Sequence, residues 1–217
     1  MEHFELDRTD EEREELVKQW IKDYWLMLVV VVLGAIGAVY GLNYYRQSKL
    51  DALNETATTT EVIGEALRKN EVDKAQELVS KVQNNEKDTS FSAVATLSLA
   101  QKYFNDKAYD KAAQQYDWII SQSDDVAMRN LARLRKARVQ SDAKQVAEAI
   151  NTLASVEGDA NLAETALLKG DILLADKQFD EAKKTYESIP KNQQINENLI
   201  NQRLELLTIM QQKQQAQ

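Results

Sequence analysis

The sequence predicts an all-α protein, in which a single N-terminal transmembrane helix is followed by an α-solenoid of stacked helical hairpins. Three observations lead to this fold class. The 22 residues 24–45 carry no charged side chain. Beyond them, apolar residues recur at three- and four-residue spacings with a single proline, and no segment alternates as a half-buried β-strand does. A pattern of small and large apolar residues also repeats along that part of the chain.

Residues 1–23 form an acidic tail, with nine acidic residues against four basic ones. Thr9 followed by Glu12 is a capping box, so a helix is expected to begin there. Apolar residues then follow at helical spacing, and we predict an amphipathic helix on the cytoplasmic membrane surface, formed by Leu16, Val17, Trp20, Ile21 and Tyr24. The acidic residues are either a solvated face or a patch for a basic partner.

Residues 24–45 are predicted to cross the inner membrane and contact its lipid. At about 1.5 Å per helical residue, this length covers the ~30 Å hydrocarbon core of a bilayer. The acidic residues before it argue against a cleaved signal peptide, and a buried core helix is the alternative. Three glycines form a small-residue face on which another transmembrane helix could pack, Gly34, Gly37 and Gly41.

The flanking basic residues predict the orientation of the span. Four Lys or Arg residues precede it, whereas Arg46 and Lys49 are the two that follow it up to residue 65. By the positive-inside rule the N-terminus is cytoplasmic. In a Gram-negative bacterium the C-terminal domain would then be periplasmic.

Residues 46–60 are predicted to be a linker or a helix extension, and residues 61–210 contain the repeats. Four alanines mark the repeats, at spacings of 37, 37 and 33 residues: Ala75, Ala112, Ala149 and Ala182. Large apolar residues lie three before and four after each alanine. The residues twelve positions before the four alanines are Ile63, Ala100, Ala137 and Gly170, and all of them except Ile63 are small.

This spacing is that of a tetratricopeptide-like repeat. Small residues let the two helices of a hairpin cross closely, and the large apolar residues fill the space beside the crossing. One hairpin cannot bury its apolar face alone, so about three to four must stack. The Gln-rich residues 211–217 are expected to be a disordered tail.

Composition excludes several functions. The net charge is −8, and the chain from Arg46 onward has 23 basic and 26 acidic residues without a basic stripe, so nucleic acid is not an expected partner. The sequence has no cysteine, His3 is its only histidine, and it lacks the common catalytic motifs. We therefore predict no enzyme, no catalytic residue, no cofactor and no metal site.

A solenoid offers a concave surface lined by the first helix of each hairpin. This surface suits extended or partly folded polypeptides, or a partner domain. Some of its leucines could instead pack within the stack. By repeat alignment the candidate residues are Val94, Leu97, Gln101, Phe104, Asn105, Leu131, Leu134, Arg138, Ser141, Leu167, Asp171 and Leu174.

Over most of its length the sequence resembles the YfgM family, the tetratricopeptide-repeat ancillary subunits of the bacterial Sec translocon. The resemblance rests on the acidic start, the single span that ends in tyrosines, and residues 16–20, 134–139, 167–173 and 199–207. The sequence departs from it at Asp23 and Tyr24, where family members often have Asn-Gly.

The resemblance implies an inner-membrane protein with its N-terminus inside, associated with the SecYEG translocon. It also implies a membrane-anchored periplasmic prolyl isomerase as companion, and translocated proteins as clients. The function expected on this basis is a non-enzymatic scaffold that docks a periplasmic chaperone or isomerase. The alternatives are a membrane-anchored tetratricopeptide receptor with cytosolic repeats and an envelope-assembly scaffold unrelated to Sec.

Overall fold

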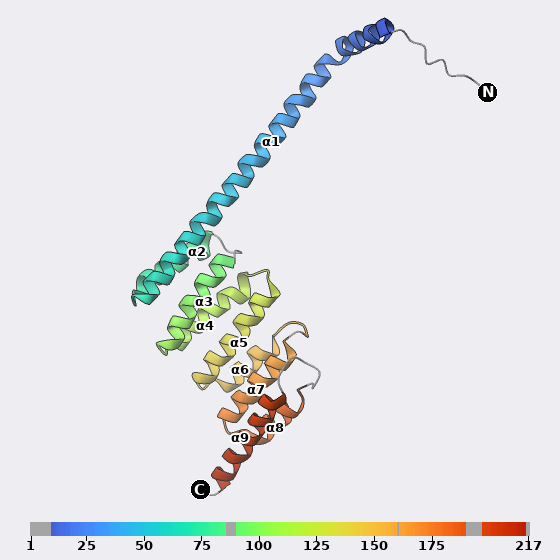
Figure 1. Cartoon of the computed structure of the whole chain (residues 1–217). Helices are drawn as coiled ribbons and strands as arrows, with labels where there is room; N and C mark the ends of the chain where they lie inside the picture. Colours follow the sequence, from blue (N-terminus) through green and yellow to red (C-terminus); the bar gives the residue numbers. More distant parts are fainter. Residues whose placement is uncertain (1–9, 86–89, 160, 190–196, 216–217) are drawn as a thin grey trace, which may run out of the picture. The chain divides into compact units, whose positions relative to one another are not determined.

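The computed structural model describes residues 10–85, 90–159, 161–189 and 197–215. In these residues the chain is helical and has no β-strand, which confirms the all-α prediction. The helices (Figure 1) are α1 (Asp10–Arg68), α2 (Val72–Asn85), α3 (Ser90–Asn105), α4 (Tyr109–Gln122), α5 (Val126–Asp142), α6 (Val146–Ala154), α7 (Leu162–Ala175), α8 (Phe179–Glu187) and α9 (Glu197–Gln215).

The chain divides into two compact units, Met1–Asn54 and Glu55–Gln217. Helix α1 begins in the first unit and ends in the second. Residues 46–60 are helical, so they extend the helix instead of forming a separate linker. Thr9 of the predicted capping box lies outside the described residues.

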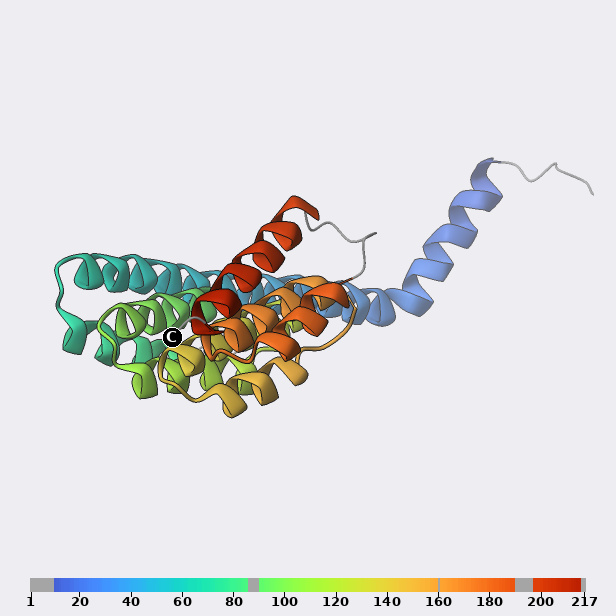
Figure 2. The ribbon, with the colours of Figure 1, turned by 90° about the horizontal axis from the view of Figure 1, so that it is seen from below.

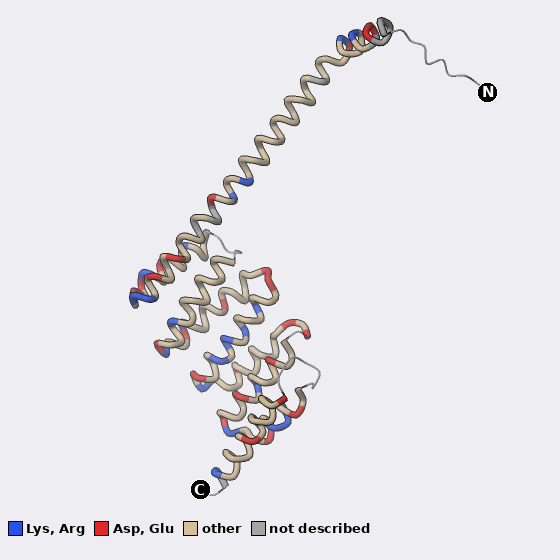
Figure 3. Tube along the Cα trace, viewed as in Figure 1, with Lys and Arg blue, Asp and Glu red and all other residues tan. Residues whose placement is uncertain are grey.

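Among the described residues, α1 contains one stretch that is long and apolar enough to cross a membrane, Val29–Asp51. It overlaps the predicted span 24–45, and none of it is buried against the rest of the chain, unlike a core helix of a soluble protein. Figure 3 shows the uncharged middle of α1 in tan. A Cβ atom added at Gly34, Gly37 or Gly41 would meet nothing within 4 Å, so the face that we predict for helix packing is open.

The second unit is a stack of helical hairpins. Successive hairpins are α3 with α4, α5 with α6, and α7 with α8, and α9 packs on the last. Before them, the end of α1 shares a core cluster with α2, through Ile63 and Ala75. Figures 1 and 2 show the later hairpins side by side in chain order. The repeat prediction is confirmed in detail, because the marker alanines are all 0% exposed: Ala75, Ala112, Ala149 and Ala182.

The turn inside each repeat has the same backbone geometry. Five residues before each marker alanine, a residue other than glycine adopts a positive φ of about 60°: Asn70, Lys107, Lys144 and Lys177. In the α5–α6 hairpin, the Gln145 N–H donates to the Gln140 carbonyl at 2.8 Å and the Lys144 N–H donates to the Ser141 carbonyl at 2.9 Å. This is a Schellman motif, which ends the first helix by satisfying its last carbonyls.

Replacing Lys144 by glycine is expected to stabilise the solenoid. The left-handed conformation costs an L-residue about 1–2 kcal/mol, and the greater freedom of glycine in the unfolded chain offsets part of the gain. We expect the free energy of unfolding to rise by about 0.5 kcal/mol. Lys183→Gly, inside α8, should instead lower it by about 1 kcal/mol. Urea denaturation of the full chain in detergent measures both, and equal destabilisation by the two glycines would contradict this interpretation.

Helix α9 caps the C-terminal end of the core that α7 and α8 form. Leu207 is buried there, and Ile200, Leu204 and Met210 pack against the same cluster. The helix runs to Gln215, so the prediction of a disordered tail from residue 211 is wrong for residues 211–215. Glutamine is a good helix former, and the packed part of α9 provides the turns from which the helix continues.

Candidate functional site

The twelve residues predicted to line the concave surface differ in their exposure to solvent. Four are exposed to solvent: Val94, Gln101, Asn105 and Arg138. Five are partly buried: Phe104, Leu131, Ser141, Leu167 and Asp171. Three are buried: Leu97, Leu134 and Leu174. The exposed and partly buried side chains remain the candidates for contact with a partner.

The buried leucines belong to the stack itself. Leu97 lies in the core cluster with Tyr103 and Tyr116, Leu134 lies in the cluster around Ala137, and Leu174 lies in the cluster beneath α9. Their side chains have little area left to offer a ligand. The repeat alignment placed them on the first helix of each hairpin, but only tertiary packing determines how deep each side chain lies.

Asp171 is engaged in a contact between three helices. The Tyr186 hydroxyl of α8 donates to Asp171 Oδ1 at 2.7 Å, and Arg203 Nε of α9 donates to the same oxygen at 2.8 Å. Burial and the neighbouring Asp171 carboxylate raise the pKa of Tyr186, so its hydroxyl is a proton donor at neutral pH. The carboxylate therefore connects α7, α8 and α9.

Helix α5 is the most basic helix of the solenoid, with five Lys or Arg residues among its 17. Arg129 and Arg133 form ion pairs with Glu157, at 2.9 and 2.7 Å, and Lys136 pairs with Asp117 at 2.6 Å. The remaining two, Arg135 and Arg138, form no ion pair in the part of the chain that the structure describes. The repeat alignment proposed Arg138 as a surface residue and missed Arg135.

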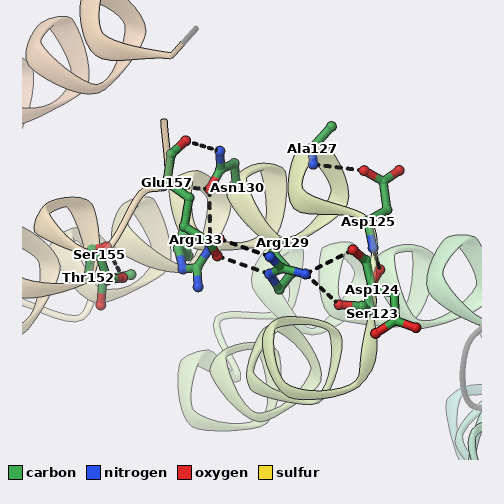
Figure 4. Close-up of polar contacts among 10 residues, drawn as sticks. All are labelled: Ser123, Asp124, Asp125, Ala127, Arg129, Asn130, Arg133, Thr152, Ser155 and Glu157. Carbon is green, nitrogen blue, oxygen red and sulfur yellow. Dashed lines mark hydrogen bonds and ion pairs between the residues drawn. The ribbon is translucent and has the colours of Figure 1, made fainter. Parts of the chain in front are cut away.

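Glu157 holds the loop between α6 and α7 against α5, as Figure 4 shows. The Asn130 side chain donates to the Glu157 carbonyl at 2.7 Å and accepts from the Glu157 N–H at 2.9 Å. Arg129 also donates to the carbonyls of Ser123 and Asp124. One turn of α5 therefore fixes the loops on both sides of its hairpin.

The charge on Glu157 makes the stability of this loop dependent on pH. Hydrogen bonds from Arg129 and then Arg133 lower the pKa of Glu157 from 4.5 to about 2. A carboxyl whose pKa is lower in the folded state than in the unfolded state stabilises the folded state above pH 4.5. This contribution is lost as the pH falls towards 2. Acid should therefore weaken the attachment of the loop.

Glu157→Gln is expected to lower the free energy of unfolding at neutral pH and to reduce its decrease in acid. Urea denaturation at about pH 7, 5 and 3 measures this. Glu148→Gln is the matched control, because Glu148 is an exposed carboxylate of α6 without an ion pair in the described chain. The assignment is wrong if Glu157→Gln loses as much stability as the wild type between about pH 5 and 3.

Two cavities of the solenoid differ in charge. One, of about 540 Å³, is lined by charged side chains that include Lys107, Asp110 and Asp142. The other, of about 360 Å³ between α6, α7 and α8, is lined mainly by apolar side chains, such as Ile150, Leu153 and Leu162, with Lys169 as its one charged residue. No group of three or more His, Cys, Asp or Glu side chains that could hold a metal ion occurs in the described residues. The described surface can bind partners by shape and charge.

These features define a class of protein: a solenoid of tetratricopeptide-like hairpins whose first helix continues from an apolar segment long enough to span a membrane. A family model described as a tetratricopeptide repeat-like domain matches residues 18–209. The chain belongs to this family.

Curated relatives have the same name in three bacteria, "Ancillary SecYEG translocon subunit". The protein of Aggregatibacter actinomycetemcomitans is 29% identical over 186 residues, which cover 85% of this chain and 91% of that protein. Those of Haemophilus influenzae and Escherichia coli are 25% and 27% identical over 179 residues, covering 82% and 80% of this chain and 87% and 84% of theirs. These relatives confirm the predicted family resemblance. No solved structure matches the chain significantly.

Proposed function

We propose that this protein is a non-enzymatic scaffold of the bacterial inner membrane and an ancillary subunit of the SecYEG translocon. The observation that carries the proposal is the similarity to three proteins of that name over at least 80% of this chain. The fold supports it, because an apolar segment of α1 and a stack of binding hairpins belong to one chain.

Tethering is the proposed mechanism. A solenoid held at the membrane has a high effective concentration near other membrane-held partners, so individually weak contacts suffice. The concave surface would dock a membrane-anchored periplasmic chaperone or prolyl isomerase, and would hold segments of newly translocated proteins. The exposed residues Gln101, Asn105 and Arg138 are the first contacts to test.

Co-purification tests the association with the translocon. The full chain, carrying an affinity tag, is isolated from membranes solubilised in a mild detergent, and the SecYEG subunits and prolyl isomerases in the eluate are quantified. We expect enrichment of SecYEG over an unrelated single-span protein with the same tag. Equal recovery with both proteins would instead favour an envelope-assembly scaffold unrelated to Sec.

The orientation is tested by an alkaline phosphatase fused after Gln217. This enzyme is active only in the periplasm, so the proposed orientation gives an active fusion in intact cells. An inactive but stable fusion would reverse the orientation and favour a receptor with cytosolic repeats. A β-galactosidase fusion at the same residue should show the opposite activity.

A further inference from the structure

The last hairpin shows how this solenoid binds a carboxylate. Asp171 accepts hydrogen bonds from the Tyr186 hydroxyl and from Arg203 of the next helix, at 2.7 and 2.8 Å. Asp171 is the residue after the small residue Gly170, and Tyr186 is the fourth residue after the marker alanine Ala182. Both positions have equivalents in every hairpin.

In the α3–α4 hairpin, the same two positions hold a tyrosine and, in place of the carboxylate, an uncharged residue. The equivalent of Tyr186 is Tyr116, four residues after Ala112, and the equivalent of Asp171 is Gln101, the residue after Ala100. The Gln101 amide donates to Asn105 Oδ1 at 3.0 Å. An uncharged amide therefore lies where the last hairpin has its anion.

The helix that follows the α3–α4 hairpin, α5, also carries arginines. Arg135 and Arg138 are three residues apart on α5, so their side chains share one face of the helix. Burial raises the pKa of Tyr116, and the positive charges of Arg135 and then Arg138 oppose this rise. Arg138 is exposed and Arg135 is partly exposed, so both can reach a ligand.

The neighbouring helices do not neutralise this pair of charges. Helix α3, which contacts α5, contains no Asp or Glu. Asp142 lies one turn after Arg138 on α5, but the two form no ion pair. Asp117 of α4 is paired with Lys136 at 2.6 Å. Among the described residues, Arg135 and Arg138 therefore have no anionic partner.

We propose that Arg135 and Arg138 bind the side-chain carboxylate of an acidic segment of a partner polypeptide. The inference rests on the proposed function, because it names the chemistry of the polypeptide held by the solenoid. A peptide that covers the two guanidinium groups removes water from them, which is unfavourable unless an anion replaces that water. Arg–carboxylate hydrogen bonds are about twice as strong as neutral ones and match the planar fork of the guanidinium.

A peptide-binding experiment tests the inference. The full chain is placed in nanodiscs of zwitterionic lipid, and fluorescence anisotropy measures the Kd of a labelled peptide of alternating glutamate and leucine with an amidated C-terminus. The matched peptide has glutamine in place of glutamate. We expect the wild type to bind the glutamate peptide on the order of tenfold more tightly, and Arg135→Gln with Arg138→Gln to abolish this preference.

Two variants make the result specific. Lys144→Gln with Lys177→Gln removes the same charge from the turns of other hairpins and should keep the preference. Arg138→Gln alone changes an exposed side chain, so it tests the site without disturbing the core and should lose part of the preference. Circular dichroism verifies that each variant is folded.

The outcomes separate this inference from the proposed function. If the wild type binds both peptides equally, or if the double arginine variant keeps the preference, the carboxylate site is wrong while the solenoid still binds polypeptide. If the lysine variant loses the preference as well, net charge is the cause and the site is also wrong. If neither peptide binds, the carboxylate site is wrong, and the co-purification with SecYEG tests the proposed function separately. Tighter binding of a glutamine–leucine peptide with a free C-terminus would show that a terminal carboxylate is the ligand instead.

Discussion

Replacing Gly170 by alanine will lower the free energy of unfolding by about 3 kcal/mol, because the new methyl group has no room. A Cβ atom at this position would lie 2.3 Å from Cε1 of the Tyr186 ring. The ring cannot move away easily, since Tyr186 is 1% exposed and its hydroxyl is bound to Asp171. The α7–α8 hairpin must therefore open or Tyr186 must leave its position.

Gly64→Ala is the matched control for this substitution. Gly64 lies within α1, and a Cβ atom there would meet only Arg68 Nη1, at 3.7 Å. Alanine in a helix is more stable than glycine by about 0.5–1 kcal/mol, so this variant should gain stability. Urea denaturation of the full chain in detergent compares the two. A Gly170→Ala variant as stable as the wild type would contradict the packing described for Tyr186.

Asn130→Ala will lower the free energy of unfolding by about 2 kcal/mol, because its side chain makes two hydrogen bonds to the backbone of the α6–α7 loop. Asn130 is 2% exposed, and both the N–H and the carbonyl of Glu157 are bound to it. It also accepts a hydrogen bond from Arg133 Nη1 at 3.1 Å. Alanine leaves the N–H and the carbonyl of Glu157 without their partner, whereas Arg133 keeps its ion pair with Glu157.

Asn105→Ala is the control for this loss, because Asn105 is exposed at the end of α3. Its change in stability should stay within about 0.5 kcal/mol. Hydrogen exchange of the α6–α7 loop adds a local measurement, and Asn130→Ala should increase exchange there more than in α3. Equal stability of the two variants would show that water replaces Asn130 at little cost.

The repeat positions were predictable from the sequence because close helix crossings demand small residues at a fixed spacing. The marker alanine Ala112, its partner Ala100 and the large Tyr116 are all buried as expected. The apolar segment of α1 was equally clear, since few structures other than a membrane helix accommodate 22 uncharged residues.

The contacts within the candidate surface were less predictable, because they join residues far apart in the chain. Nothing near Asn130 in the sequence indicates that it binds the backbone of Glu157, 27 residues later. The positive φ at Lys144 was hidden in the same way, since lysine does not mark a left-handed turn as glycine does. One signal was available: Lys107, Lys144 and Lys177 occupy the same position in three repeats.

Site-specific photo-crosslinking in living cells tests the central claim most directly. A photoreactive amino acid is placed at Gln101, on the proposed binding surface, or at Gln114, an exposed residue of α4, and a secretory protein is stalled during translocation. We predict crosslinks from Gln101 to the stalled protein or to a translocon partner, and few from Gln114. Equal labelling from both positions, or none to any component of the secretory machinery, would contradict a solenoid that holds polypeptides beside the SecYEG channel.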